Sequence, residues 1–420
     1  MAGLNKYKAY PEYKDSGVEW LGEIPKHWAV CRLKNLATIK NGQDYKSVQA
    51  ECGYPVIGSG GQFMFASKYM YDKPSVLLGR KGTIDKPLYI NEPFWTVDTM
   101  YYTELNDDVD AKYFYYLALT IQFSRYSTNT ALPSMTQEHL SNYKFAAPKV
   151  ESDRKQITDF LDHETAKIDN LIEKQQQLIN LLKEKRQAVI SHAVTKGLNP
   201  DVPMKDSGVK WLGEVPEHWI VSPIKHVLAN QDFRRIPLSS EERGKRSGEY
   251  PYYGASGIID YIDNYIFDEP TVLVGEDGAN LVARNTSLAF SAVGEYWVNN
   301  HAHILKPYDG LVDYWAEAIE HIDINPIVSG SAQPKLTAEA LNNLKIAYSP
   351  QLEERSQIEG CINVQKNKYK KLISIAAEQV ILLQERRTAL ISAAVTGKID
   401  VRNWVAPDMS DIEESQEAAA

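Results

Sequence analysis

The sequence contains only three cysteines, Cys31, Cys52 and Cys361, and no two of them form a CxxC pair. This spacing excludes the usual zinc-ribbon and dithiol redox motifs. The chain also lacks a run of about 18 apolar residues that could cross a bilayer, and its first residues lack the apolar core of a signal peptide. These absences predict a cytoplasmic protein that has no membrane partner.

The motifs of several common enzyme classes are missing too. There is no GxxxxGK[ST] phosphate loop, no GxGxxG dinucleotide loop and no HExxH metal helix. His301 and His303 flank one alanine, but no cysteine or carboxylate accompanies them at metal-ligand spacing. We therefore predict no metal site and no catalytic residue. A scattered set of nuclease carboxylates and lysines is too degenerate to recognise in one sequence, so a stand-alone nuclease or methyltransferase is kept as the lowest-ranked hypothesis.

The net charge is negative, with 46 Lys and Arg against 55 Asp and Glu, which by itself disfavours a polyanionic partner. The charge is uneven, however. More than half of the excess of nine lies in a predicted acidic tail, which contains Asp408, Asp411, Glu413, Glu414 and Glu417. Local basic surfaces remain compatible with the composition of the rest of the chain.

An internal duplication dominates the sequence. DSGVEWLGEIPKHW, from Asp15, and DSGVKWLGEVPEHW, from Asp206, differ at three of 14 positions. Three further pairs of segments keep the same order: those that start at Tyr54 and Tyr250, at Ala131 (ALPSMTQEHL) and Ala332 (AQPKLTAEAL), and at Arg186 (RQAVISHAVT) and Arg387 (RRTALISAAV). Such a repeat indicates one architecture built twice around a pseudo-twofold axis.

Each copy has two parts of different composition. The first part is rich in Gly, Pro, Tyr and short β-branched runs such as SVLLG and TVLVG, which predict strands separated by turns. The second part is a helical segment of about 40 residues, roughly 60 Å long. We predict an α+β protein with two mixed α/β domains and two long helices that form a coiled coil. The expected boundaries are residues 1–150 for the first domain with its leading segment, 151–197 for the central helix, 198–350 for the second domain with its leading segment, 351–402 for the C-terminal helix and 403–420 for the tail.

A heptad frame can be written for both helices. In the central helix the expected seam contains Leu161, Ile168, Leu171, Leu178, Leu182 and Val189, and in the C-terminal helix it contains Ile362, Tyr369, Leu372, Leu383 and Leu390. Two half-apolar helices need a partner, and each is the natural partner of the other. The heptad spacing alone is also compatible with a coiled-coil assembly scaffold that does not bind DNA, and this is the alternative function.

Over about residues 10–400, the chain resembles the specificity subunit of type I restriction-modification systems. The resemblance rests on the repeated DSGVEWLGEIPKHW and DSGVKWLGEVPEHW segments, the LLGRKGT and LVGEDGA turns, the TALPSM and SAQPKL loops and the two repeated helices. It implies two target recognition domains, each of which reads one half of a split site in double-stranded DNA. It also implies that the two coiled-coil helices are antiparallel, hold the domains apart and so set the spacer of the site, and dock two methyltransferase subunits and, through them, restriction subunits. The chain itself would be non-catalytic and would bind no cofactor, while its partner subunits use S-adenosylmethionine, ATP and Mg2+.

In the first domain, the Gly79–Gly82 turn places Arg80 and Lys81 on a tight loop, where arginine could bind guanine or either cation could bind phosphate. An exposed basic turn without any function is the alternative interpretation. The remaining candidates for DNA contact in this domain are Thr130 and Ser134, which offer hydroxyl groups, and Lys46, Gln62, Lys68 and Arg125.

The equivalent turn of the second domain, Gly275–Gly278, carries Glu276 and Asp277 instead, so phosphate binding there is disfavoured. An acidic side chain could still accept a hydrogen bond from cytosine N4. The candidates for DNA contact in this domain are Arg234, Arg235, Lys245, Arg246, Arg284, Asn299, Asn300, Gln333 and Lys335. The difference between the two turns predicts unlike half-sites.

Overall fold

The structure is a computed structural model and describes residues 7–126, 133–330 and 333–406. The chain forms two compact units. Unit 1 contains the residues up to 176 and those from 378 onward, and unit 2 contains residues 177–377. Candidate Thr130 and the acidic residues from Asp408 onward lie outside the described residues.

Unit 1 begins with a small hairpin, β1 (Tyr13–Asp15) and β2 (Glu23–Pro25), and continues into domain 1, which extends from β3 (Trp28–Arg32) to β12 (Lys144–Pro148). β3 and β12 pair in an antiparallel ladder, so the chain enters and leaves the domain at one place. Between them lie two four-stranded sheets: β4-β11-β8-β9 (Ala37–Asn41, Met100–Leu105, Ser75–Gly79 and Leu88–Ile90) and β10-β6-β7-β5 (Trp95–Thr96, Tyr54–Gly58, Gly61–Ala66 and Gln49–Ala50).

Unit 2 repeats this plan. The hairpin is β13 (Met204–Asp206) with β14 (Glu214–Pro216), and domain 2 extends from β15 (Ile220–Pro223) to β23 (Lys345–Tyr348), which pair with each other. Its two inner sheets are β16-β22-β19-β20 (Leu228–Asn230, Ala302–Pro307, Thr271–Gly275 and Ala289–Ala292) and β18-β17-β21 (Gly257–Ile262, Ser247–Gly254 and Trp297–Val298).

The runs SVLLG and TVLVG form β8 and β19, and every residue of both strands is buried. Successive side chains of a strand point to opposite faces, so a strand that is covered on both faces has apolar residues at every position. Val76 and Leu78 belong to the core that also contains residues of the long helices, whereas Leu77 belongs to a second core beneath β6 and β10. Each central strand therefore connects two hydrophobic cores.

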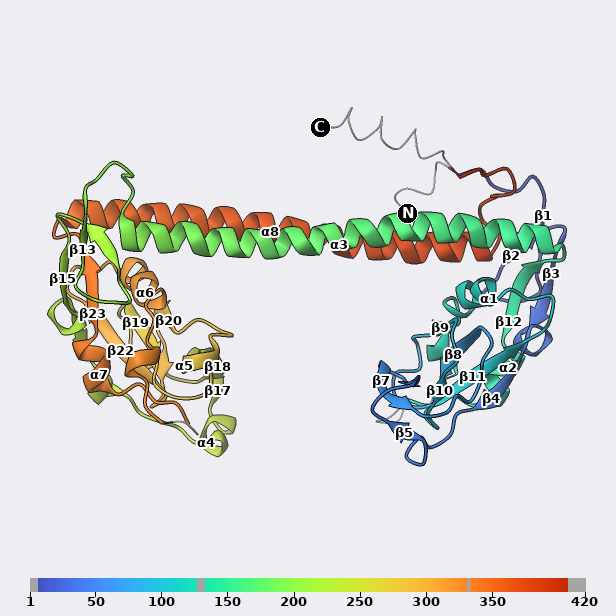
Figure 1. The fold of residues 1–420 in the computed structure, drawn as a ribbon, viewed down its shortest axis with the longest axis horizontal. Coiled ribbons are helices and arrows are strands. Elements are labelled where there is room, and N and C mark those ends of the chain that lie inside the picture. Colours follow the sequence, from blue (N-terminus) through green and yellow to red (C-terminus); the bar gives the residue numbers. More distant parts are fainter. Residues whose placement is uncertain (1–6, 127–132, 331–332, 407–420) are drawn as a thin grey trace. The chain divides into compact units, whose positions relative to one another are not determined.

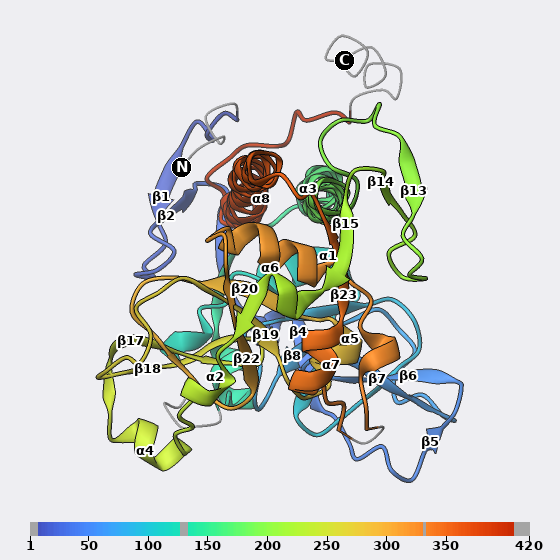
Figure 2. The same ribbon diagram turned by 90° about the vertical axis from the view of Figure 1, so that its left-hand side faces the viewer.

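Short helices cover the sheets. In unit 1 these are α1 (Ala111–Ala118) and α2 (Gln137–Asn142), and in unit 2 they are α4 (Ser240–Gly244), α5 (Asn280–Ala283), α6 (Val312–Glu320) and α7 (Ala338–Asn343). Asp110 caps α1 by accepting a hydrogen bond from the backbone of Tyr113 at 2.8 Å. In unit 2, α6 lies between the inner sheet and the long helices, as Figure 2 shows.

The two long helices are α3 (Glu151–Lys196, 46 residues) and α8 (Leu352–Val395, 44 residues), which lie side by side (Figure 1). In unit 1, Leu161 and Ile168 of α3 share a core with Leu390 and Ile391 of α8. In unit 2, the C-terminal part of α3 shares a core with the N-terminal part of α8, so the helices are antiparallel. At 1.5 Å per residue, α3 is about 69 Å long. The predicted fold class is confirmed.

The predicted heptad repeat has two apolar positions that should face the partner helix. The structure confirms the first position, but the second was placed one residue too early. In α3, Leu161 and Ile168 are buried as expected, but Leu171 is 47% exposed and Leu178 is 42% exposed. The neighbouring residues Ile172 and Ile179 are more buried and occupy the seam instead. The same shift occurs in α8, where Leu372 is exposed and Ile373 lies in the seam. The step from the first seam position to the second is therefore four residues, not three.

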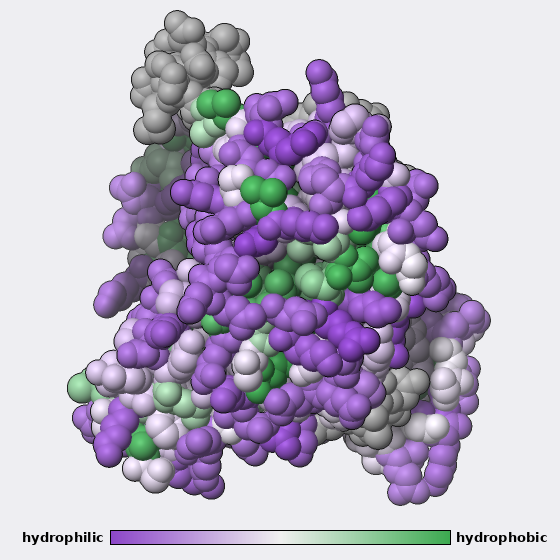
Figure 3. Space-filling model, turned by 90° about the vertical axis from the view of Figure 1, so that its right-hand side faces the viewer, coloured by the Kyte–Doolittle hydropathy of each residue, from purple (hydrophilic) through white to green (hydrophobic). Residues whose placement is uncertain are grey.

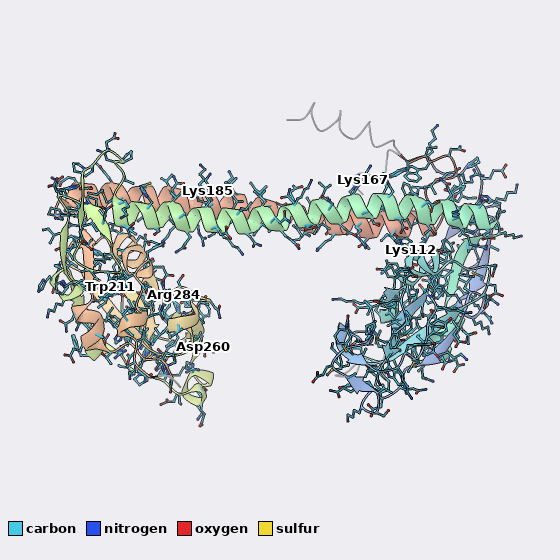
Figure 4. All side chains as sticks on the ribbon, in the orientation of Figure 1. Lys112, Lys167, Lys185, Trp211, Asp260 and Arg284 are labelled. Carbon is cyan, nitrogen blue, oxygen red and sulfur yellow. The ribbon has the colours of Figure 1, made fainter. Side chains whose placement is uncertain are left out.

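Charged side chains attach each domain to its own long helix, with opposite polarity in the two units. In unit 1, Lys112 of α1, labelled in Figure 4, binds Asp162 of α3 at 2.7 Å. In unit 2 the cation is on the long helix, where Lys366 of α8 binds Glu317 of α6 at 2.7 Å. The two copies thus use the same contact surface with reversed charge.

The surface in the view of Figure 3 is mainly hydrophilic, with apolar side chains gathered in one interrupted patch. Among the described residues, no helix has both the length and the apolar character needed to span a bilayer.

Candidate nucleic-acid interface

The two motif-bearing loops of domain 1 are joined by their backbones. The Gly82 amide donates to the Pro133 carbonyl at 3.0 Å, and the Met135 amide donates to the Arg80 carbonyl at 3.0 Å. Lys81 and Ser134 face each other as an antiparallel bridge between these two bonds. The turn after β8 and the loop before α2, more than 50 residues apart in sequence, therefore form one edge of the domain.

Glycine is required at both ends of this turn. A Cβ on Gly79 would lie 2.5 Å from the backbone of Ile84, and Gly82 has a φ of 83°. A larger residue at either place would clash or adopt a strained backbone conformation. The turn therefore holds Arg80 and Lys81 in a fixed backbone geometry.

The two cations of this edge, Arg80 and Lys81, have no carboxylate within ion-pairing distance in the described part of the chain. The guanidinium group of Arg80 donates to the backbone carbonyl of Asp98 at 3.2 Å and lies 5.9 Å from the ring centre of Tyr101. Burial raises the pKa of the Tyr101 phenol despite the opposing effect of Arg80, so the neighbouring ring stays neutral. Two uncompensated cations on a rigid turn suit an anionic partner.

Domain 2 has the same backbone arrangement at the equivalent edge. The Gly278 amide donates to the Pro334 carbonyl at 3.0 Å, and the Leu336 amide donates to the Glu276 carbonyl at 2.8 Å. Asp277 and Lys335 occupy the bridge positions of Lys81 and Ser134. The main-chain frame is thus shared, while the side chains on it differ.

The acidic turn of domain 2 is neutralised inside the domain. Glu276 is only 9% exposed and forms ion pairs with Arg235 and with Lys335, the latter at 3.3 Å. Burial alone would raise the pKa of Glu276, but the hydrogen bonds and charges of Arg235, His303 and Lys335 outweigh it and hold the pKa below its usual range. Each oxygen of the Glu276 carboxylate therefore already has a basic partner within the domain.

His303 is buried at the centre of this network. Its Nδ1 lies 2.6 Å from a carboxylate oxygen of Asp232, and its Nε2 lies 2.8 Å from the carbonyl oxygen of Leu336. Both partners can only accept, so both ring nitrogens donate and the imidazole is positively charged. The hydrogen bond and charge of His303 overcome the effect of burial and lower the pKa of Asp232. His303 is a structural cation that ties β22 to the loop before α7.

These paired loops can be compared with known proteins. The profile of one family, described as the type I restriction modification DNA specificity domain, matches residues 25–183 and again residues 216–390. The two matches cover well over half of the chain. The chain belongs to this family. Each match contains one domain with most of the long helix that follows it.

Curated relatives carry matching names. A putative type I restriction enzyme specificity subunit of Haemophilus influenzae is 32% identical over 129 residues, which are 30% of this chain and 32% of the relative. The chain thus aligns with about a third of that protein's length. A type I restriction enzyme specificity subunit of Methanocaldococcus jannaschii is 24% identical over 355 residues, which are 78% of this chain and 77% of the relative.

The fold is also known from a solved structure. A chain from a structure titled for complex assembly and conformational transition of the type I restriction-modification system aligns with a TM-score of 0.66. The alignment covers 90% of this chain and 99% of that chain at 14% identity, a likeness that concerns the fold.

The other candidates of specificity domain 1 do not gather at the same edge. Gln62 lies on β7 and lines a cleft with Gln49 and Phe63. Lys46 and Lys68 are exposed, and their side chains form no hydrogen bond or ion pair with the described residues. Arg125 stacks over Trp20 at 5.5 Å, beside the leading hairpin. Of the candidates of this domain that the structure describes, it therefore brings together Arg80, Lys81 and Ser134.

Most candidate cations of specificity domain 2 are bound to carboxylates of the same domain. Arg234 pairs with Glu269, Lys245 with Glu241, and Arg246 with Asp263. Arg235 and Lys335 belong to the Glu276 network. Arg284, labelled in Figure 4, ends α5 with a φ of 52° and donates to the backbone of Glu320. Apart from Lys245 with Glu241, these ion pairs join residues 17 to 59 positions apart, and the sequence did not reveal such distant partners.

The polar candidates of specificity domain 2 differ in accessibility. Asn299 is 5% exposed and uses its side-chain oxygen to accept from the backbone amide of His301. Asn300 and Gln333 are exposed. His301, which was not among the predicted DNA contacts, lies at the same edge, where its ring contacts Asp277. His301 has the position in domain 2 that Thr99 has in domain 1, and this equivalence could have identified it. The Thr99 carbonyl accepts a hydrogen bond from the Arg80 amide, and the His301 carbonyl accepts one from the Glu276 amide.

Within the described ranges, no three His, Cys, Asp or Glu side chains converge in a way that could hold a metal ion.

Proposed function

We propose that this chain is the DNA-binding specificity subunit of a type I restriction-modification complex, in which each domain reads one half of a bipartite site. The observation that carries the proposal is the shared loop frame of the two domains, which presents a basic turn in one and a neutralised acidic turn in the other. A common frame with different side chains is suited to reading two unlike half-sites.

Arg80 and Lys81 are the groups proposed to approach DNA in domain 1. An arginine can bind guanine O6 and N7 with two parallel hydrogen bonds in the major groove, and a lysine beside it can bind phosphate. Contacts to phosphate release counterions, so affinity that depends on them falls steeply with salt.

The long helices are proposed to set the spacing between the half-sites. A helix of 46 residues has a fixed rise per residue, and α3 has no Pro or Gly to interrupt it. Its length therefore translates directly into a distance along DNA.

The helices are also proposed to dock two methyltransferase subunits. Each carries exposed apolar side chains on one flank beside the seam, namely Leu171, Leu178 and Leu181 on α3 and Leu372, Ile375 and Leu382 on α8. Leu181 is 61% exposed, and Leu382 is 48% exposed. One such stripe on each copy of the repeat suits two identical partners, and restriction subunits would join through them.

The chain itself is proposed to make and break no covalent bond and to bind no cofactor. In this scheme S-adenosylmethionine, ATP and Mg2+ are used by the methyltransferase and restriction subunits. The specificity chain contributes sequence selection and geometry.

The experiment is to purify the full chain with its methyltransferase subunits and to map the adenines or cytosines methylated in a degenerate duplex library. The expected product is one asymmetric bipartite motif with a constant spacer, and the chain alone should methylate nothing. Methylation without sequence preference in the complex would instead support the coiled-coil scaffold. Methylation by the chain alone would support a stand-alone enzyme.

A further inference from the structure

The edge of domain 2 carries an exposed histidine whose ring is fixed by a carboxylate. We propose that His301, oriented by Asp277, is a specificity-determining residue that forms one hydrogen bond to a base edge in the half-site of domain 2. This inference rests on the proposed function and names the group that takes the place of the Arg80 and Lys81 turn.

The orientation of the ring follows from its contacts. Nδ1 of His301 lies 3.0 and 2.8 Å from the two carboxylate oxygens of Asp277, so Nδ1 carries the proton and donates. The side chain of His301 is 49% exposed, and that of Asp277 is 20% exposed. Nε2 has no partner among the described residues and is the free end of the ring.

The backbone beneath the ring is held on both sides. The His301 amide donates to the buried side-chain oxygen of Asn299 at 2.8 Å, and its carbonyl accepts from the Glu276 amide at 2.9 Å. The Asn299 amide in turn donates to the carbonyl of Tyr253 at 3.0 Å. A side chain fixed through both its ring and its main chain loses little freedom on binding, which favours directional recognition.

The local charge favours a base over a phosphate. Three carboxylates lie in this cluster, from Asp232, Glu276 and Asp277. They are matched by three cations, Arg235, Lys335 and the charged ring of His303. With this balance the edge offers no net attraction to phosphate, unlike the edge of domain 1. A single directional donor or acceptor in a neutral setting distinguishes bases instead.

Nε2 can serve in two ways. As a lone pair it accepts from the amino group of adenine or cytosine, and as N–H it donates to the O6 or N7 of guanine. Either contact selects a base at one position and leaves the other half-site untouched.

The test replaces His301 in the full complex with methyltransferase subunits and measures base preferences in the degenerate library. His301→Asn keeps a group able to reach Asp277 but removes the free end of the ring. We expect the preference at one base of one half-site to fall by at least about tenfold, as one lost base contact implies, with the other half-site unchanged. His226→Asn, on an exposed histidine of the same unit, is the matched control and should change nothing.

A second variant separates positioning from contact. Asp277→Asn should weaken the same base preference in the wild-type background and have no further effect in the His301→Asn background, because Asp277 acts through the ring. Unchanged preferences in His301→Asn, with folding confirmed by circular dichroism, would overturn the inference while leaving the specificity function intact. If the wild-type complex selects no bipartite motif, the proposed function itself fails.

Discussion

Glu354 accepts a hydrogen bond from the indole Nε1 of Trp219 at 3.1 Å. The same carboxylate accepts from Ser349 at 2.6 Å and lies 2.8 Å from Nε2 of His218. Trp219 ends the second repeated motif, and Glu354 lies in the first turn of α8, so this contact fastens domain 2 to its long helix.

The corresponding contact is missing in unit 1. Trp28 is fully buried, and none of the described residues accepts a hydrogen bond from its Nε1. The residue equivalent to Glu354 is Asp153, which is one methylene shorter and lies 3.8 Å from His27. A buried donor without a partner costs roughly 1–3 kcal/mol.

Replacing Asp153 with Glu should therefore stabilise unit 1. We expect a gain of about 1 kcal/mol, because the longer side chain can reach the Trp28 indole. Hydrogen exchange of the full chain, resolved by domain, measures this gain as slower exchange around Trp28 and α3. The reciprocal change, Glu354→Asp, should destabilise unit 2 by about the same amount. Equal exchange in both variants and the wild type would show that the indole contact has no energetic role.

The Glu354 contact should also depend on pH. Burial acts to raise the pKa of Glu354, but the hydrogen bonds from Ser349, His218 and Trp219 outweigh it and lower the pKa below the ordinary value of 4.5. The contribution of Glu354 to the free energy of unfolding is therefore complete above pH 4.5 and is lost as the pH falls through the lower value of the folded state. The difference in unfolding free energy between the wild type and Glu354→Gln, measured by urea titration, should shrink as the pH falls from 5 toward 3. A constant difference over the whole range would contradict this assignment.

Substitution of the basic turn should separate base reading from phosphate binding. Arg80→Ala should cost about 1–3 kcal/mol of binding and relax the preference at one base pair if Arg80 reads guanine. Lys81→Ala should weaken binding to all sequences and reduce the slope of log affinity against log salt by about one if Lys81 binds phosphate. Fluorescence anisotropy of the full complex at several salt concentrations measures both effects, with the exposed Lys34→Ala as control. If neither variant changes affinity or preference, the turn lies outside the interface.

Lengthening both long helices should lengthen the spacer. One heptad inserted after Gln176 in α3 and another after Ala377 in α8 preserves the observed seam and adds about 10 Å. Since one base pair rises 3.4 Å, the spacer should grow by about three base pairs. Methylation mapping in the degenerate library reads this directly. A spacer that keeps its wild-type length would remove the helices from the role of ruler.

The exposed flanks of the helices should be needed for subunit assembly. Leu181→Lys and Ile375→Lys place a charge where a partner would bury apolar surface, at a cost of roughly 1.5–3 kcal/mol for each side chain. Both residues are exposed, so folding of the free chain should not change. Analytical ultracentrifugation with the methyltransferase subunit should show weaker assembly. Lys185→Leu at an exposed position of α3 is the control, and equal loss from it would argue against a specific docking stripe.

The sequence predicted the two long helices and their pairing because the repeat and the absence of Pro and Gly from the first helix are strong signals. It misplaced half of the seam for a physical reason. Adjacent apolar residues occur at several steps, including Leu171 with Ile172 and Leu372 with Ile373. Either member of such a pair completes a heptad, and only the packing of the two helices selects one of them.

The candidate site was predictable to the extent that it depends on local chain geometry. The Gly79–Gly82 turn and the Ser134 loop each have a recognisable sequence, and the structure places them against each other. In domain 2, Arg234 binds Glu269 and Arg235 binds Glu276, each of which is more than 30 positions away along the chain. No pattern along the chain distinguishes a cation that faces solvent from one that is bound within its own domain.

The bonds that join the two loops in each domain are made by main-chain atoms, and apart from the glycines they place no demand on side-chain identity. Amino acids at Arg80, Lys81 and Ser134, or at Asp277, His301 and Lys335, can therefore be exchanged without dismantling the scaffold that carries them. Under the proposed function, single-codon changes at this edge would change the DNA half-site that a domain reads while its fold stays the same. The main-chain atoms of these residues hold the two loops together, and their side chains are left free to vary.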